Sequence, residues 1–251
     1  MKQNEIYVKS TLDGTMQPSL FYKAEGGEKL PLLVGLHTWS ADRFNQIRNM
    51  LPYAEKYNFH LLLPEFRGPN LTTNPNSTYA CGSEYAKQDI IDAVEHCIAE
   101  ECVDADNIFL LGASGGGHMA LLMAGFRPDY YKAIGAFVGI TDLKKWSEEN
   151  LNYREHVLAC CSNDEEEMSK RSPMNYVDMI ATSNTKIFHG KYDPSVPVSH
   201  SIRIFNAINE KYPNAKVYLD IFDGGHEMDM EVAMKWIISQ YNRGEKEEVT
   251  G

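Results

Sequence analysis

The feature that most constrains the fold is an alternation of strand-like and helix-like patterns along the chain. Residues 30–37 form a continuous apolar run, as expected of a strand buried on both faces, and shorter strand-like runs follow at 59–64 and 107–111. Between them, residues 43–57 and 84–102 carry apolar side chains at helical spacing. Because parallel strands need long connections, the alternation predicts a mostly parallel sheet covered on both faces, an α/β/α sandwich of three layers.

The rest of the chain extends this pattern, with two departures. Residues 5–9 and 17–23 surround an Asp13-Gly14 turn and predict an N-terminal antiparallel hairpin. Residues 141–184 break the alternation with a polar stretch that contains Trp146 and an acidic cluster at 164–167. We interpret 141–184 as a lid or cap-like insertion over the carboxyl edge of the sheet, where such sheets bind ligands; a plain surface excursion is the alternative. The other expected strands are 133–140, 186–189 and 216–222, and the other expected helices are 115–126, 198–211 and 228–241, all within one domain spanning 1–251.

Composition limits the classes of binding partner and the cellular compartment that we expect for this protein. The 251 residues are 43% hydrophobic and carry a formal charge of −11, so the chain lacks the basic surplus that binding to nucleic acid requires. No apolar run approaches bilayer length, and the first 13 residues lack the apolar core of a signal peptide. The five cysteines are odd in number and show no Cys-x-x-Cys spacing, which favours reduced thiols over disulfides or a metal site. We expect a cytoplasmic protein without a membrane partner, and the sequence does not decide between a monomer and a homo-oligomer.

A serine lies among glycines where a strand meets a helix. Residues 112–116 read Gly-Ala-Ser-Gly-Gly, which matches Gly-x-Ser-x-Gly between the expected strand 107–111 and the expected helix 115–126. Small neighbours on this sharp turn leave the hydroxyl of Ser114 unobstructed at the edge of the sheet. No Lys-Ser or Lys-Thr follows the glycines, so a phosphate-binding loop of the Walker type is excluded.

A serine nucleophile needs a histidine base, which in turn needs a carboxylate to orient it. In folds with this turn the chain order is serine, acid, histidine. Asp193 follows the expected strand 186–189, and His226 follows the expected strand 216–222. Parallel strands would bring all three to one edge of the sheet. Asp142, which follows the strand before, is the alternative acid.

Four stretches give the chain a clear resemblance to a known family. They are Gly-Ala-Ser-Gly-Gly-Gly at 112–117, Ser-Pro-Met-Asn-Tyr at 172–176, His-Gly-Lys-Tyr-Asp-Pro-Ser-Val-Pro at 189–197 and Gly-Gly-His-Glu at 224–227. In these stretches the chain resembles the α/β-hydrolases, and within them the catalytic domain of the prolyl oligopeptidase (S9) family and related esterases. The resemblance implies that Ser114 is the nucleophile, Asp193 the orienting acid and His226 the general base.

The oxyanion hole of such an enzyme needs two N–H donors. The resemblance implies that Gly115 supplies one and that the loop after residues 30–37 supplies the other. Relatives have glycine after the histidine of this loop, whereas this chain reads His-Thr-Trp, which leaves Thr38 and Trp39 as candidates. We expect Trp39 and Trp146 to contact the substrate. His37, His118 and His189 are expected to be structural.

A complete set of these groups predicts an active serine hydrolase that forms an acyl-enzyme and uses neither metal nor cofactor. Peptidases of the resembled family carry a large β-propeller, for which 251 residues leave no room. The sequence therefore favours a carboxylesterase acting on small acyl or carbohydrate-linked esters. A small peptidase acting on short peptides is the nearest alternative, and a catalytically silent binding protein with the same fold is the third.

Overall fold

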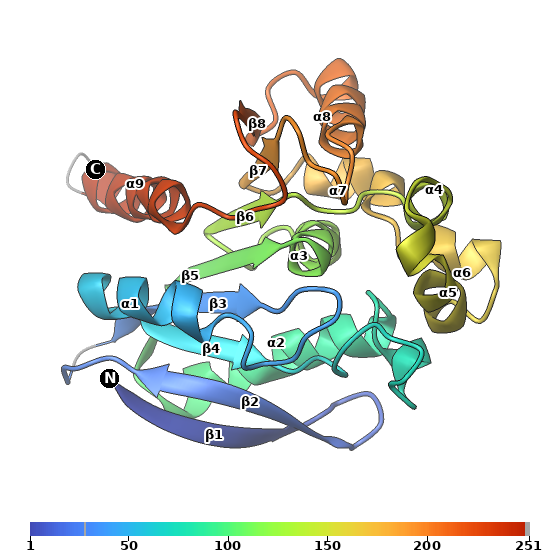
Figure 1. Cartoon of the computed structure of the whole chain (residues 1–251). Coiled ribbons are helices and arrows are strands. Elements are labelled where there is room, and N and C mark those ends of the chain that lie inside the picture. The colour runs from blue at the N-terminus through green and yellow to red at the C-terminus, as the bar shows by residue number, and fades with distance from the viewer. Residues whose placement is uncertain (28, 249–251) are drawn as a thin grey trace.

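The computed structural model describes residues 1–27 and 29–248, and within them eight strands form one sheet with helices on both faces (Figure 1). The strand order is β1-β2-β4-β3-β5-β6-β7-β8. Strands β1 and β2 pair antiparallel, β2 also runs antiparallel to β4, and the pairs from β4 through β8 are parallel. The three-layer α/β/α sandwich and its N-terminal hairpin are confirmed.

The elements have the following bounds. The strands are β1 (Lys2–Lys9), β2 (Met16–Lys23), β3 (Leu30–Leu36), β4 (His60–Pro64), β5 (Val103–Ala113), β6 (Ala133–Phe137), β7 (Thr185–Gly190) and β8 (Val217–Phe222). The helices are α1 (Ile47–Tyr57), α2 (Glu84–Glu100), α3 (Gly115–Phe126), α4 (Leu143–Glu149), α5 (Leu151–Cys160), α6 (Glu165–Lys170), α7 (Val177–Ile180), α8 (Ser199–Lys211) and α9 (Met230–Glu248). Two short 3₁₀ helices are η1 (Ser77–Tyr79) and η2 (Pro173–Tyr176).

Two apolar cores explain why the central strands are continuous apolar runs. Along β5, Ile108 and Leu110 pack into the core under α2, α3 and α8. Phe109 and Leu111 point the other way, into the core under α1 and α9. All four side chains are essentially inaccessible to solvent. Side chains alternate between the two faces of a strand, so a strand covered on both faces must be apolar at every position.

Helix α1 begins four residues later than its apolar spacing suggested. The chain turns at Asp42, whose carboxylate accepts a hydrogen bond from Phe44 N–H at 3.0 Å. The amide of Arg43 donates to Glu65 Oε2 at 3.1 Å, which holds this turn against the end of β4. A side chain that binds nearby backbone groups competes with helix formation, and here it delays the helix to Ile47.

The segment 141–184 is mostly helical rather than irregular. It contains α4, α5, α6, η2 and α7, and the first three of these helices lie beyond the carboxyl ends of the parallel strands (Figure 1). Their apolar residues form a third core that includes Trp39, Trp146 and the buried thiols of Cys81, Cys160 and Cys161. The segment thus packs against the loop that follows β3.

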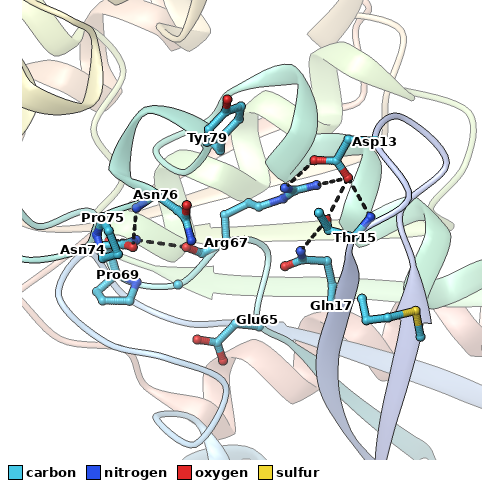
Figure 2. A pocket seen from close by; sticks show the side chains of 12 residues that line it. Asp13, Thr15, Gln17, Glu65, Arg67, Pro69, Asn74, Pro75, Asn76 and Tyr79 are labelled. Carbon is cyan, nitrogen blue, oxygen red and sulfur yellow. Dashed lines mark hydrogen bonds and ion pairs between the residues drawn. The ribbon is translucent and has the colours of Figure 1, made fainter.

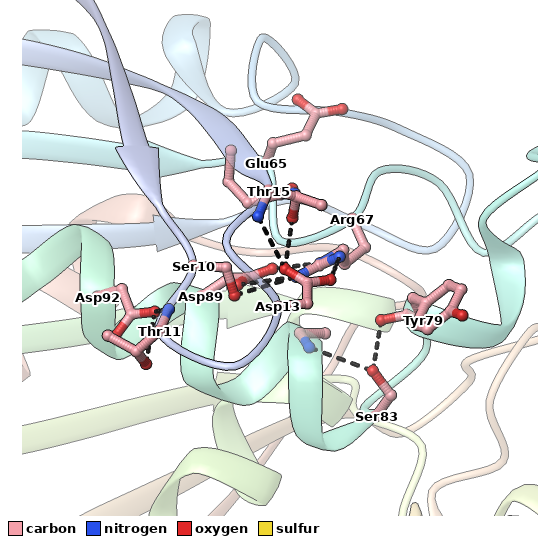
Figure 3. Close-up of polar contacts among 12 residues, drawn as sticks. Ser10, Thr11, Asp13, Thr15, Glu65, Arg67, Tyr79, Ser83, Asp89 and Asp92 are labelled. Atoms are coloured by element: carbon pink, nitrogen blue, oxygen red, sulfur yellow. Dashed lines mark hydrogen bonds and ion pairs between the residues drawn. The ribbon is translucent and has the colours of Figure 1, made fainter.

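A buried arginine joins the hairpin to the rest of the molecule (Figure 3). The guanidinium of Arg67 donates to Asp13 at 2.8 and 3.2 Å, to Ser10 Oγ at 3.1 Å and to both carboxylate oxygens of Asp89. The side chain of Arg67 is 6% exposed and that of Asp89 is 1% exposed. The hydrogen bond from Arg67 holds the pKa of Asp13 well below its usual range. The carboxylates of Asp13 in the hairpin turn and Asp89 in α2 therefore bind the same guanidinium, that of Arg67.

Candidate active site

The turn between β5 and α3 holds Ser114 in a backbone conformation that few residues adopt. Its φ and ψ are 58° and −119°, and a positive φ costs a residue with a side chain on the order of 1–3 kcal/mol. Two hydrogen bonds fix the turn: Ser114 N–H donates to Phe137 O at 2.9 Å, and His118 N–H donates to Ser114 O at 2.8 Å. The serine lines a cavity of about 160 Å³ at the edge of the sheet.

The glycines around Ser114 let this turn approach its neighbours. A Cβ on Gly116 would lie 2.5 Å from the carbonyl oxygen of Leu36 in β3. A Cβ on Gly112 would collide with the backbone of Gly116, and one on Gly117 would collide with the backbone at Phe137. These neighbours are main-chain atoms that cannot swing aside, so the turn has its observed position only because these side chains are absent.

Asp193 follows β7, and its buried carboxylate accepts hydrogen bonds from two backbone amides and from His226. Its side chain is inaccessible to solvent. Oδ1 accepts from the amides of Ser195 at 2.8 Å and Val196 at 2.9 Å, and Oδ2 lies 3.4 Å from Nε2 of His189. Burial alone raises the pKa of Asp193, but hydrogen bonds from His189, His226 and Val196 outweigh it and hold the pKa well below its usual range. The group is therefore a carboxylate at all ordinary pH values.

His226 follows β8 and binds this carboxylate. Its Nδ1 lies 2.7 Å from Asp193 Oδ2. A carboxylate only accepts hydrogen bonds, so Nδ1 carries the hydrogen and Nε2 of a neutral ring keeps a lone pair. His226 and Ser114 line the same cavity. Within the described residues no hydrogen bond joins them, and contacts of this kind often form only when substrate is bound.

Two backbone amides beside Ser114 can donate hydrogen bonds to an oxyanion. One is that of Gly115, and the structure distinguishes Thr38 from Trp39 as the source of the other. Thr38 N–H donates to Asn45 Oδ1 at 3.2 Å and is already occupied. Trp39 N–H has no acceptor within the described residues. The backbone of Trp39 lies against Gly115, where a Cβ would come 2.6 Å from Trp39 Cα. The geometry therefore favours Trp39 over Thr38 as the partner of Gly115.

His37 braces this loop, a contact that the sequence analysis missed. Its ring nitrogens lie beside two carbonyl oxygens, Nδ1 at 2.9 Å from Thr38 O and Nε2 at 2.8 Å from Glu65 O. The ring also stacks on Phe66, with centroids 3.9 Å apart. Thr38 O and Trp39 N–H belong to one planar peptide group, so a contact at the oxygen fixes the direction of the N–H.

Aromatic side chains wall the cavity. The ring centroids of Trp39 and Trp146 are 4.8 Å apart, and those of Trp146 and Tyr153 are 4.9 Å apart. Trp146 Nε1 donates to Ser195 O at 2.8 Å, which fixes the indole against the loop of Asp193. The structure thus brings the two predicted tryptophans to the cavity. The sequence analysis did not select Tyr153 as a substrate contact, and it lies in α5, the helix after that of Trp146.

The other candidates from the sequence lie elsewhere. Asp142 accepts from Lys145 N–H at 3.0 Å and caps α4, so it does not reach His226. His118 contacts Arg171 O at 2.7 Å, and His189 contacts Ser201 Oγ and Val196 O. Both histidines are buried. Their contacts agree with structural roles.

A larger cavity of about 680 Å³ lies between the hairpin and residues 65–79 (Figure 2). Several polar groups that line it bind one another. Asn74 Nδ2 donates to Arg67 O and Pro69 O, its Oδ1 accepts from Asn76 N–H, and Gln17 Nε2 donates to Thr15 Oγ1. These groups have few hydrogen bonds left to offer, so the cavity beside Ser114 is the better candidate site.

A serine on a strained strand-turn-helix, followed in the chain by a buried acid and a histidine that bind each other, defines a serine hydrolase of the α/β-hydrolase fold. The comparison with family models agrees, because the model of the prolyl oligopeptidase family matches residues 82–242. The chain belongs to the prolyl oligopeptidase family.

Similar proteins include peptidases and one esterase. The chain is 26% identical over 211 residues to the acylamino-acid-releasing enzyme of Arabidopsis thaliana. The matched region covers 77% of the chain and 27% of that enzyme. It is 29% identical over 92 residues to feruloyl esterase B of Neurospora crassa, covering 35% of the chain and 31% of the esterase. The acylaminoacyl peptidase of Pyrococcus horikoshii shares the fold, with a TM-score of 0.70 and 20% identity over 90% of the chain and 37% of that structure. The chain spans about a quarter to a third of the length of these curated relatives.

Among the described residues, no helix is long and apolar enough to cross a membrane. In the same part of the chain, no group of three or more histidine, cysteine or acidic side chains is arranged to hold a metal ion.

Proposed function

We propose that Ser114, His226 and Asp193 form a catalytic triad that hydrolyses a small acyl compound. The observation that carries the proposal is the 2.7 Å bond between His226 and the buried carboxylate of Asp193, in a cavity that His226 shares with Ser114. Nε2 of His226 takes the hydroxyl proton as Ser114 Oγ attacks the acyl carbon, and then gives it to the leaving group. Water, deprotonated by the same nitrogen, releases the acyl group from Ser114.

The oxyanion formed in each attack is bound by the amides of Gly115 and Trp39. Gly115 is the first residue of α3, where amides lack partners within the helix and the helix dipole favours negative charge. Trp39 N–H belongs to the same peptide group as Thr38 O. The contact of His37 with Thr38 O therefore fixes the direction of this N–H. Two such donors stabilise the charge that develops in the transition state.

The substrate class follows from the cavity and from the relatives. About 160 Å³ between aromatic rings fits a small acyl group or a short side chain. The names of the relatives include acylamino-acid-releasing enzymes, so we place the amide bond of a short N-acylated peptide first. A small ester, which the sequence analysis favoured, is the second candidate, supported by the similarity to a feruloyl esterase.

The choice between an amide and an ester substrate is tested with two compounds that share one acyl group, such as the p-nitroanilide and the p-nitrophenyl ester of N-acetylalanine. Esters are intrinsically more reactive, so the quantity to compare is kcat divided by the rate in buffer. We expect the larger acceleration for the anilide. An acceleration confined to the ester would establish an esterase, and turnover of neither would support a binding protein.

Replacing His37 with phenylalanine is expected to lower kcat by about 10²-fold, because a loosened peptide group no longer aims Trp39 N–H. KM should change little, since the cavity wall is unaltered. His37→Asn keeps an amide N–H near the position of Nδ1 and should recover part of the rate. A change in KM alone would contradict this positioning role.

A further inference from the structure

A second cavity, of about 510 Å³, shares the His226 loop with the active site. His226 lines the cavity beside Ser114, whereas Asp223, Glu227, Met228 and Asp229 on either side of it line the second one. A volume of this size is typical of sites for small ligands.

The floor of the second cavity is aromatic. Phe137 from β6 and Phe188 from β7 stack face to face, with ring centroids 4.2 Å apart and planes 7° apart. Phe137 and Phe188 are 0% and 1% exposed, so the apolar surface open to a ligand comes from the half-buried side chains of Phe222 and Met228 that lie over them. An apolar body placed here would be removed from water against the Phe222 ring and the Met228 side chain.

The rim is acidic. Of its four carboxylates, Asp220 has a cationic partner in Lys186 at 3.3 Å. Asp223, Glu227 and Asp229 have no ion pair within the described residues. Glu227 Oε1 accepts from Gly225 N–H, and Asp229 Oδ1 accepts from the first amides of α9. The second oxygen of each of these two groups has no donor in the described part of the chain. Asp229 lies at the N-terminus of α9 and interacts electrostatically with Lys235, so Asp223 and Glu227 carry the uncompensated charge of the rim.

We propose that this cavity binds a small organic cation in which an ammonium or guanidinium group is joined to an aromatic or alkyl body. The body lies against Phe222 and Met228, and the cation is held at the rim by Asp223 and Glu227. The ammonium of Lys186 already lies 4.9 Å from the centroid of the Phe188 ring and pairs with Asp220, so the preference for a cation comes from Asp223 and Glu227. An anion of the same shape would be repelled by the rim, and a neutral molecule would gain only the apolar contact.

The probe is the 2-phenylethylammonium ion, with binding measured by isothermal titration calorimetry. Three controls separate its features: ethylammonium lacks the ring, 2-phenylethanol lacks the charge, and 3-phenylpropanoate reverses the charge. We expect single-site binding of the probe and at least about tenfold weaker binding of each control, which corresponds to about 1.4 kcal/mol. Equal binding of the alcohol and the ammonium ion would overturn the proposal, as would no binding of the probe at about 10 mM.

Variants locate the binding. Asp223→Asn combined with Glu227→Gln removes two rim charges and should weaken binding about tenfold or more. Glu165→Gln combined with Glu166→Gln on α6 changes the net charge equally, far from the cavity, and should leave binding unchanged. Val232→Phe narrows the cavity from α9 and should also weaken binding. An equal loss in both double variants would show a general charge effect and refute a defined site, and so would unchanged binding in the rim variant.

Discussion

The variant Ser114→Ala is expected to hydrolyse a p-nitrophenyl ester about 10⁴- to 10⁶-fold more slowly than the wild type. Removing the hydroxyl leaves the hydrogen bond between His226 and Asp193 intact, but His226 then has no nucleophile to activate. Ser40 and Ser195 line the same cavity, yet neither directly precedes the first residue of a helix, as Ser114 precedes Gly115 of α3. Initial rates at saturating substrate, corrected for hydrolysis in buffer, measure the effect.

Ser40→Ala is the matched control, because it removes an exposed hydroxyl from the same cavity. Its rate should stay near that of the wild type. Circular dichroism and the thermal midpoint of Ser114→Ala should match the wild type, since alanine also has a Cβ on this strained backbone and loss of one hydroxyl disturbs no core contact. Wild-type turnover in Ser114→Ala would refute the triad, and turnover equal to buffer in the wild type would favour a binding protein.

Arg67→Met is expected to lower the free energy of unfolding by about 3 kcal/mol or more, the usual cost of breaking a buried ion pair. The substitution leaves the carboxylate of Asp89, 1% exposed, without its cation. It also releases Asp13, so the tip of the hairpin loses one of its attachments to α2 and keeps the hydrogen bonds from Thr11 to Asp92. Urea unfolding followed by tryptophan fluorescence measures the change.

Lys211→Met provides the comparison with an exposed ion pair, because Lys211 binds Asp178 at 2.6 Å and both side chains are 55% exposed. It should shift the unfolding midpoint much less than Arg67→Met, since water solvates the remaining carboxylate. The double variant Arg67→Met with Asp89→Leu should recover part of the lost stability. Equal effects of Arg67→Met and Lys211→Met would show that the buried network does not stabilise the fold.

The central strands and helices could be predicted because their patterns depend on burial by the sheet itself. Helix α3 occupies Gly115–Phe126, the span that the sequence predicted. The four helices of 141–184 could not be predicted in this way. They are between four and ten residues long, too short to show a period, and their apolar residues meet side chains from distant loops such as Trp39.

The site was predictable to the extent that local motifs mark it. Ser114 lies in a five-residue pattern, and Asp193 and His226 each follow a strand, so chain order selected them as candidates. Chain order also left Asp142 as an alternative acid. Contacts between distant residues could not be read in this way. The bond from Thr38 to Asn45 distinguishes the two loop amides, and the Arg67 network joins residues 54 and 22 positions apart. Neither leaves a periodic or compositional pattern in the sequence.

The hydrogen bonds around Asp193 also have a consequence for how the molecule assembles. The amides of Ser195 and Val196 and the ring of His189 all come from the same short stretch of chain as the carboxylate. That stretch can therefore stabilise the ionised acid without residues 223–229. His226 then binds a carboxylate that is already charged, so forming this contact requires no proton to be taken up or released by the acid.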